Sequence, residues 1–371
     1  MCAKKISKDY AISFPAIKGV QAGREYYVTM CPLKLLPTMF QTTIAEIPPE
    51  LRAQRDMNKN RVSPITRYLT ENSDNYIFSS IAASIDSEVQ FDSYGDDLIG
   101  RKIGTLSVSM DAKFIINDGQ HRVAAITEAL KEDSTLGNET ISVVLFIDCG
   151  LNKSQQMFAD LNRYAVRPTK SLSILYDHRD PIAKLANDLV QNVSVFKGMT
   201  EKAKSSISNR SRKLFTLSSI YQATKTFLQK KDGEDILEEE RQLALDFWEN
   251  VAVHIPDWQA AVKKQVSTSE LRSDFIHAHG IALQALAIAG GCLVRTHPAS
   301  WKSTLPKLKG LDWARENAPL WEGRALVGGT LNKSQKNVTL TANLIKQILE
   351  LPLTPSEEIV ERNYVKGQNG N

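Results

Sequence analysis

The chain has 371 residues, of which 42% are hydrophobic and 24% charged, and its formal net charge is +4. This composition is ordinary for a soluble globular protein, and a chain of this length buries enough core to need neither disulfides nor a metal for stability. The small basic excess permits a nucleic-acid partner without arguing for one, because the clustering of charge matters more than the total.

Strand-like patterns are concentrated in the first 170 residues. Residues 1–24 are predicted to be a tail, and the first strand is expected from Tyr26 to Pro32. A helical stripe lies within residues 51–72. Further strands are expected at residues 76–85, 105–110, 114–116 and 141–147. Two more helices are expected, at residues 123–130 and at residues 154–161 with Ser154 as the N-cap.

After about residue 170 strand-like patterns nearly vanish, and leucine and alanine become frequent among interspersed charges. Helices are expected at residues 181–193, 214–230, 236–253, 271–289 and 339–350. The sequence therefore predicts an α+β protein, with an N-terminal α/β domain over residues 25–170 and a C-terminal helical domain over residues 171–371.

The strongest local signal is a strand-turn-helix around Asp118. Gly119 allows a sharp turn and the close approach of a ligand, and the free amides at the start of the helix favour an anion. The guanidinium of Arg122 suits phosphate, and His121 can donate to a phosphate or carry a proton. Asp118 would cap the helix, or hold a metal or a ribose hydroxyl. On spacing alone, a plain turn with Asp118 as the N-cap stays open beside a phosphate site.

Residues 118–122 spell Asp-Gly-Gln-His-Arg, the name-giving pentapeptide of the DGQHR domain. That domain resembles the ParB and sulfiredoxin superfamily, whose members bind nucleotide phosphates at the same strand-to-helix turn. The resemblance implies a ParB/sulfiredoxin-like N-terminal domain in which Gly119, Gln120 and Arg122 bind phosphate. It also makes Asp118 and His121 catalytic candidates, with ATP or another NTP and Mg²⁺ as the expected cofactor. No metal site within the protein is predicted.

Two further segments resemble the DndB type of DGQHR protein. Residues 158–172 look like the Glu-Asn-x-x-Arg region of ParB, which helps close the nucleotide pocket, although Leu161 stands where ParB has Glu. Residues 55–69 resemble the segment before the first long strand. The resemblance implies nucleotide or phosphate contacts from Asn162, Arg163, Arg167, Asn58 and Arg61. A solvated helix edge and a solvated junction are the alternatives for these segments.

The densest basic run covers residues 202–213 and has five cations and no acid in twelve residues. Its four serines and one asparagine are also good donors to phosphate oxygens. Such a run supplies salt-sensitive affinity for DNA, with a solvated loop as the alternative. The predicted DNA contacts are Lys202, Lys204, Arg210, Arg212 and Lys213.

Four cysteines lie far apart, at Cys2, Cys31, Cys149 and Cys292, and no CxxC occurs. The spacing matches neither a zinc site nor a disulfide framework and favours reduced thiols in the cytoplasm. For Cys31 a redox-sensitive thiol stays open beside a buried, inert one. The start of the chain lacks a secretory signal, and the apolar stretch Gly280–Val294 is too short to span a bilayer, which takes about 20 residues.

The resemblance to DndB implies a cytoplasmic DNA-binding regulator of DNA phosphorothioation, in which sulfur replaces a non-bridging backbone oxygen. This regulator would control expression of the modification genes, with nucleotide as a gate, and would not be the sulfur-transfer enzyme. The expected partners are double-stranded DNA, other phosphorothioation proteins and a second copy of the chain, with no membrane. The alternative is a ParB-like NTPase that supports DNA modification or restriction. A scaffold for the modification enzymes also stays open.

Overall fold

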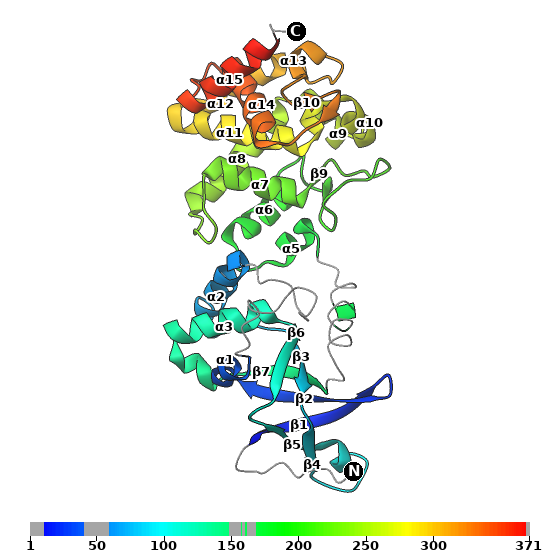
Figure 1. Ribbon diagram of the computed structural model, residues 1–371. Coiled ribbons are helices and arrows are strands. Elements are labelled where there is room, and N and C mark those ends of the chain that lie inside the picture. Colours follow the sequence, from blue (N-terminus) through cyan, green and yellow to red (C-terminus); the bar gives the residue numbers. More distant parts are fainter. Residues whose placement is uncertain (1–10, 41–58, 148–156, 158–159, 162–167, 369–371) are drawn as a thin grey trace. The chain divides into compact units, whose positions relative to one another are not determined.

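The computed structural model describes residues 11–40, 59–147, 157, 160–161 and 168–368. Two compact units make up the chain, residues 1–166 and residues 167–371. The first unit carries the large sheet and the second is mainly helical (Figure 1). This arrangement confirms the predicted α+β class, with strands first and helices later. None of the described helices is long and apolar enough to cross a membrane.

A seven-stranded sheet with the order β4-β5-β1-β2-β7-β3-β6 forms the frame of the N-terminal unit. Neighbouring strands are antiparallel except β3 and β7, which are parallel. The strands are β1 (Ala11–Gln21), β2 (Arg24–Pro32), β3 (Ile81–Asp86), β4 (Val89–Ser93), β5 (Ile103–Ser109), β6 (Lys113–Asp118) and β7 (Thr140–Ile147).

Three helices of this unit lie together beside the strands β3, β6 and β7 (Figure 1). They are α1 (Leu36–Met39), α2 (Val62–Thr70) and α3 (Gln120–Glu132). The central helix α3 packs against both others and buries Val123, Ile126 and Ala129 in the core of the unit. Because α3 begins where β6 ends, this packing fixes the position of the turn between them.

The prediction that residues 1–24 form a tail is wrong for the described part of that range. Residues 11–21 form β1, which pairs with both β2 and β5 inside the sheet. Phe14 and Ala16 point into the core, as alternation in a strand requires. The predicted strand at residues 76–85 begins only at Ile81. Before the strand, the amide of Ile77 donates to the hydroxyl of Tyr68, 3.0 Å away, rather than to a neighbouring strand.

The helical unit is built around α11 (Gly280–Thr296), which packs against α7 and α14. Its core is rich in aromatic rings, among them Phe247, Trp248 and Trp258. Other helices of eight or more residues are α6 (Pro181–Asn192), α7 (Leu217–Leu228), α8 (Glu238–Val253), α14 (Gln335–Ile348) and α15 (Pro355–Gln368). The shorter ones are α5 (Lys170–Tyr176), α9 (Pro256–Val262), α10 (Thr268–Asp274), α12 (Trp301–Thr304) and α13 (Ala318–Trp321). Two short strand pairs complete the unit, β8 (Thr200–Glu201) with β9 (Phe215–Thr216) and β10 (Leu326–Val327) with β11 (Thr330–Leu331).

The single helix predicted over residues 271–289 is wrong. Helix α10 ends at Asp274, a 3-10 turn covers Ile276–Ala278, and α11 begins at Gly280. The break arises because Phe275 pairs with Ala314 and the amide of Ile276 donates to the carbonyl of Trp313. Consequently His277 and His279 do not share a helix.

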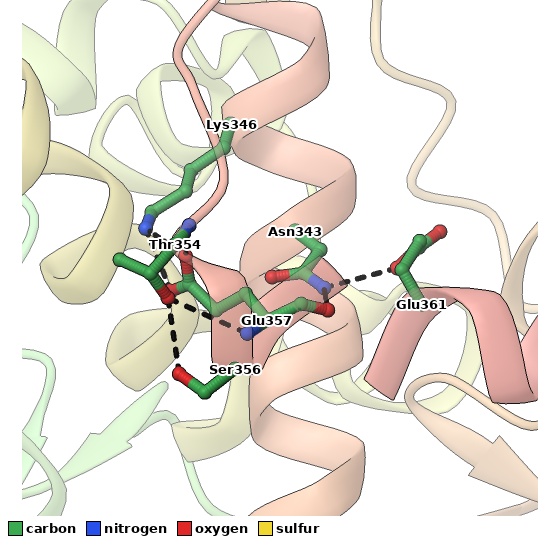
Figure 2. A network of polar contacts seen from close by, with 6 residues as sticks. All are labelled: Asn343, Lys346, Thr354, Ser356, Glu357 and Glu361. Atoms are coloured by element: carbon green, nitrogen blue, oxygen red, sulfur yellow. Dashed lines mark hydrogen bonds and ion pairs between the residues drawn. The ribbon is translucent and has the colours of Figure 1, made fainter. Parts of the chain in front are cut away.

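A buried polar network joins α15 to α14 within the helical unit. Figure 2 shows Lys346 and Asn343 of α14 facing Glu357 and Glu361 of α15. The ammonium of Lys346 donates to both oxygens of Glu357 at 2.7 Å, and Nδ2 of Asn343 donates to Oε2 of Glu361 at 3.0 Å. Arg324 also pairs with Glu361 in this buried site. These charge-assisted bonds hold α15 in one register on α14.

Candidate functional site

The pentapeptide lies at the junction of β6 and α3. Asp118 is the last residue of β6 and pairs with Ala82 of β3 beside a register shift. Gly119 then adopts φ +106°, in the left-handed region that favours glycine, and serves as the N-cap of α3. Gly119 has no side chain to donate or accept, so no side-chain hydrogen bond caps the helix. The alternative with Asp118 as the N-cap is therefore wrong.

The side chain of Asp118 instead holds the guanidinium of Arg122, one helical turn later. Nη2 of Arg122 donates to Oδ2 of Asp118 at 2.9 Å and to the carbonyl of Ser80 at 3.0 Å. Nη1 donates to the hydroxyl of Ser79 at 2.6 Å. The guanidinium is mostly buried and its position is fixed by three residues from two segments. It lies across the turn at the start of α3, where a helix attracts anions.

Gly119 is needed for the position of Arg122 as well as for the turn. A Cβ on Gly119 would lie 3.0 Å from Nη2 and 3.2 Å from Nε of Arg122. Any other residue at this position would push the guanidinium away. Nε of Arg122 is buried and has no hydrogen-bond partner among the described residues, so one donor of the guanidinium is left for a ligand.

His121 follows on the first turn of α3 and is neutral near pH 7. Burial lowers its pKa below the ordinary value of 6.5, and the positive charge of Arg61 lowers it further. Its Nε2 is buried without a hydrogen-bond partner in the part of the chain that the structure describes. Arg61, at the start of α2, thus lies within electrostatic reach of the pentapeptide. A neutral imidazole beside a cation can accept a proton or hydrogen-bond a ligand.

Met157 contacts the residue that precedes the pentapeptide. Nδ2 of Asn117, next to the pentapeptide, donates to the hydroxyl of Ser84 at 2.7 Å and contacts the sulfur of Met157 at 3.1 Å. Of the residues predicted to close the pocket, Asn58, Asn162, Arg163 and Arg167 lie outside the described residues. Gln120 is half-buried on the first turn of α3. Among the described residues no group of three or more His, Cys, Asp or Glu side chains could hold a metal ion.

The basic run of residues 202–213 connects β8 to β9 and is an ordered loop. We call it the basic loop. Arg272 of α10 fastens it by donating to the carbonyls of Ser208, Asn209, Ser211 and Lys213. Hydroxyls of the same helix add two bonds, from Ser269 to the carbonyl of Asn209 at 2.6 Å and from Thr268 to that of Ser211 at 3.2 Å. An ordered loop presents its charges without an ordering cost on binding.

The five predicted DNA contacts fall into two groups, two that line a hollow and three that are exposed. Lys202 and Lys213 line one side of a hollow of about 770 Å³ together with Lys197. The ammonium of Lys213 already donates to the carbonyl of Gly198 at 2.8 Å. Lys204, Arg210 and Arg212 are exposed, and none of them forms an ion pair with another described residue. Lys197 lies before β8 and outside residues 202–213, so the sequence pattern of the basic loop gave no indication that it contributes to this hollow.

The thiol of Cys31 is inert in this structure. It is fully buried in the core of the N-terminal unit, with its sulfur 3.5 Å from that of Met39. Burial raises the pKa of the thiol to about 12, so almost no thiolate exists at neutral pH. The buried alternative for Cys31 is therefore favoured over the redox-sensitive one.

Comparison with known protein families gives a match over most of the chain. The model of the DndB family, described as DNA-sulfur modification-associated, matches residues 14–352. No curated protein and no solved structure matches the chain. The family match covers both units, including the pentapeptide and the basic loop.

Proposed function

The chain belongs to the DndB family of DNA-sulfur modification-associated proteins, and from this premise we propose that it is a cytoplasmic, DNA-binding regulator of phosphorothioate modification. It binds double-stranded DNA through the basic loop and controls expression of the modification genes. The single observation that carries the DNA-binding part is the ordered loop with three exposed cations, Lys204, Arg210 and Arg212.

DNA affinity of the basic loop comes from cations that no nearby described carboxylate neutralises. Exposed lysine and arginine side chains release counterions from DNA when they contact phosphates, and this release supplies salt-sensitive affinity. A carboxylate partner would cancel that gain, and these three cations have none among the described residues. Because Arg272 holds the backbone beneath them, the three charges are presented from a fixed base. Backbone and hydroxyl donors of the same loop add contacts to phosphate oxygens.

A triple charge reversal tests this surface. Lys204→Glu, Arg210→Glu and Arg212→Glu together are expected to weaken binding to a duplex by at least about 100-fold at 100 mM salt, since removing a cation from a phosphate lowers affinity. The matched control reverses three exposed lysines elsewhere in the same unit, Lys184, Lys263 and Lys366, with the same change in net charge. An equal decrease in both variants would mean that only net charge matters, and would contradict binding by the basic loop.

Regulation of the modification genes requires preference for their control region. We expect tighter binding to the DNA upstream of the modification genes than to an unrelated duplex of equal length and composition. A reporter gene behind that upstream region should be repressed by the wild-type chain and released by the triple charge reversal. Full repression by that variant would show that regulation does not require the exposed cations of the basic loop.

A second candidate, a ParB-like NTPase or nucleotide gate, is favoured by the pentapeptide. Gly119 leaves the start of α3 open, Arg122 holds a guanidinium across it, and His121 keeps a buried nitrogen without a described partner. In this proposal Arg122 and Gln120 bind phosphate, Asp118 and His121 act on the bound nucleotide, and a Mg²⁺ ion brought with the nucleotide would supply charge neutralisation. Calorimetry with ATP, GTP and CTP in the presence of Mg²⁺ tests it. Absence of binding by all three, or binding unchanged in Arg122→Gln, would refute it.

A further inference from the structure

A cavity of about 590 Å³ lies in the helical unit beneath the basic loop, at the start of α11. Three cations line it, Arg272 from α10, Arg315 and Lys333. The wall also carries hydroxyls from the basic loop, from α7 and from α10, which belong to Ser205, Ser206, Ser219 and Ser269. We call this cavity the α11 pocket. No aspartate or glutamate among the described residues lines it, so its charge is entirely positive.

The three cations of the α11 pocket have no carboxylate partner among the described residues. Arg272 donates to carbonyls of the basic loop. Arg315 donates to the carbonyls of Ser273 and Gly329, at 3.0 and 3.1 Å. Lys333 is solvent-exposed and forms no hydrogen bond or ion pair with another described residue, and partial desolvation by the surrounding protein lowers the pKa of its ammonium. Three cations that converge without neutralisation create a strong positive potential, which is costly unless an anion compensates it.

Helix α11 adds to this potential. It has 17 residues, begins at Gly280 and has no side-chain hydrogen bond at its N-cap His279. A Cβ at Gly280 would lie 2.6 Å from the hydroxyl oxygen of Ser219 and 3.0 Å from Nζ of Lys333. The glycine therefore lets a hydroxyl and an ammonium approach the first amides of the helix. Amides at a helix start together with a lysine and a hydroxyl are the donors that phosphate prefers.

His279 supports this arrangement without adding charge. Burial and the neighbouring cations hold its pKa at about 4, so its ring is neutral at pH 7. Its Nε2 lies 2.8 Å from the carbonyl oxygen of Arg272, which can only accept, so Nε2 carries the proton. The ring therefore fixes the backbone of Arg272 to the start of α11.

We propose that the α11 pocket binds a phosphate group, brought either by a free nucleotide or by the backbone of a DNA strand. The volume exceeds that of a bare phosphate and lies in the range of small-molecule sites, about 300–1,000 Å³. Phe215 and Leu214 line the same cavity and give it an apolar wall beside the cationic one. The α11 pocket is built from residues of the helical unit, whereas the pentapeptide belongs to the N-terminal unit, and the proposal does not depend on DNA binding by the exposed cations of the basic loop.

The test measures binding of three probes by calorimetry with the full chain: inorganic pyrophosphate, ADP and a short 5′-phosphorylated duplex. The variants are Lys333→Gln and Lys333→Glu, since this side chain is exposed and bonds no other described residue, so we expect its replacement to preserve the fold. The matched control is Lys336→Gln, which removes an exposed lysine three residues away that does not line the pocket. Arg122→Gln serves as a second control that reports binding at the pentapeptide.

We expect Lys333→Gln to lower the affinity for at least one probe by about tenfold, which corresponds to the loss of one charge-assisted hydrogen bond. Lys333→Glu should lower that affinity further. Lys336→Gln and Arg122→Gln should bind that probe with an affinity within about twofold of the wild-type value. Weaker pyrophosphate or ADP binding would identify a free nucleotide as the source of the phosphate, and weaker duplex binding alone would identify DNA. The proposal is overturned if no probe binds, or if the Lys333 variants bind every probe as tightly as Lys336→Gln does.

Discussion

Arg122 and Asp118 form an ion pair across the turn between β6 and α3, with 2.9 Å between Nη2 and Oδ2. The carboxylate of Asp118 is half exposed whereas the guanidinium of Arg122 is mostly buried, so this is not an ordinary surface salt bridge. Its guanidinium also bonds Ser79 and Ser80, and it packs on a glycine that leaves room for it. The pentapeptide therefore fixes one cation, the guanidinium of Arg122, at the start of α3.

The close approach of Arg122 to Gly119 predicts a specific cost for Gly119→Ala. We expect a decrease of about 2–4 kcal/mol in the stability of the N-terminal unit, from the left-handed backbone and the displaced guanidinium. Gly23→Ala is the matched control, because Gly23 also has a positive φ (+73°) but a Cβ there meets nothing within 4 Å. Urea unfolding measures both. In an Arg122→Ala background the cost of Gly119→Ala should fall toward that of Gly23→Ala but stay above it, because the new Cβ would still lie 3.2 Å from Cγ1 of Ile81. An unchanged cost would refute the steric role of the guanidinium.

Burial of Cys31 predicts slow chemistry at its thiol. In a chain with Cys2, Cys149 and Cys292 replaced by serine, a thiol reagent at pH 8 should label Cys31 only after the N-terminal unit opens, because the raised pKa of the thiol leaves almost no thiolate. The rate should rise steeply in urea. Fast labelling of the native protein would instead support a redox-sensitive thiol. The same variant reports the stability of the N-terminal unit for the glycine substitutions.

The hydrogen bonds from Arg272 to the basic loop predict that the order of this loop affects DNA binding. Arg272→Ala removes the bonds to four carbonyls of the basic loop, so hydrogen exchange of residues 205–213 should accelerate and duplex binding should weaken. Arg210→Ala is the control, since it removes an exposed cation and leaves those bonds in place. It should weaken DNA binding without a change in exchange. Unchanged exchange in Arg272→Ala would contradict the fastening of the loop.

The polar network between α14 and α15 predicts sensitivity of the helical unit to acid. Burial raises the pKa of Glu361, but hydrogen bonds from Arg324 and Asn343 outweigh it, so its pKa lies below the ordinary 4.5. The stabilisation is therefore complete above pH 4.5 and is lost as pH falls through the lowered pKa. All five tryptophans lie in this unit, so their fluorescence reports its unfolding.

Glu361→Gln tests this network. It leaves Arg324 buried without its charge partner and should cost about 3 kcal/mol at pH 7, while flattening the decline of stability below pH 4.5. The control, Asp246→Asn, breaks the exposed pair with Lys302 and should cost at most about 1 kcal/mol. An equal cost for both variants, or an unaltered acid transition in Glu361→Gln, would show that the network does not stabilise the helical unit.

Sequence patterns predicted those elements whose signal is local. The boundary of β6, Gly119 and α3 follows from an apolar strand, a glycine and a helical stretch in direct succession. The apolar stretch that forms most of α11 is also visible in the sequence, although the predicted helix began too early and ended too soon. The strand β1 was missed because Pro15 and Gly19 interrupt its pattern, and only pairing with β2 and β5 reveals it. The broken helix at Phe275 depends on Ala314, which is distant in sequence.

The candidate sites show the same division. The pentapeptide and the basic loop are contiguous, so their residue types alone drew attention to them. The α11 pocket collects Arg272, Arg315 and Lys333 from separate segments, and no local pattern joins them. The ion pair of Arg122 and Asp118 was not predicted, because Asp118 ends β6 and only Arg122 lies on α3. Ser79 and Ser80 reach Arg122 only because β3 pairs with β6.

The central claim, DNA binding through the basic loop, is tested most directly by the salt dependence of duplex affinity. We predict that the logarithm of the binding constant falls linearly with the logarithm of salt concentration for the wild-type chain. For Lys204→Glu, Arg210→Glu and Arg212→Glu combined, the slope should be shallower by about 0.9 for each phosphate that the variant no longer neutralises. The control reversal of Lys184, Lys263 and Lys366 should keep the wild-type slope. Duplex affinity without salt dependence, or one slope for all three proteins, would contradict the claim.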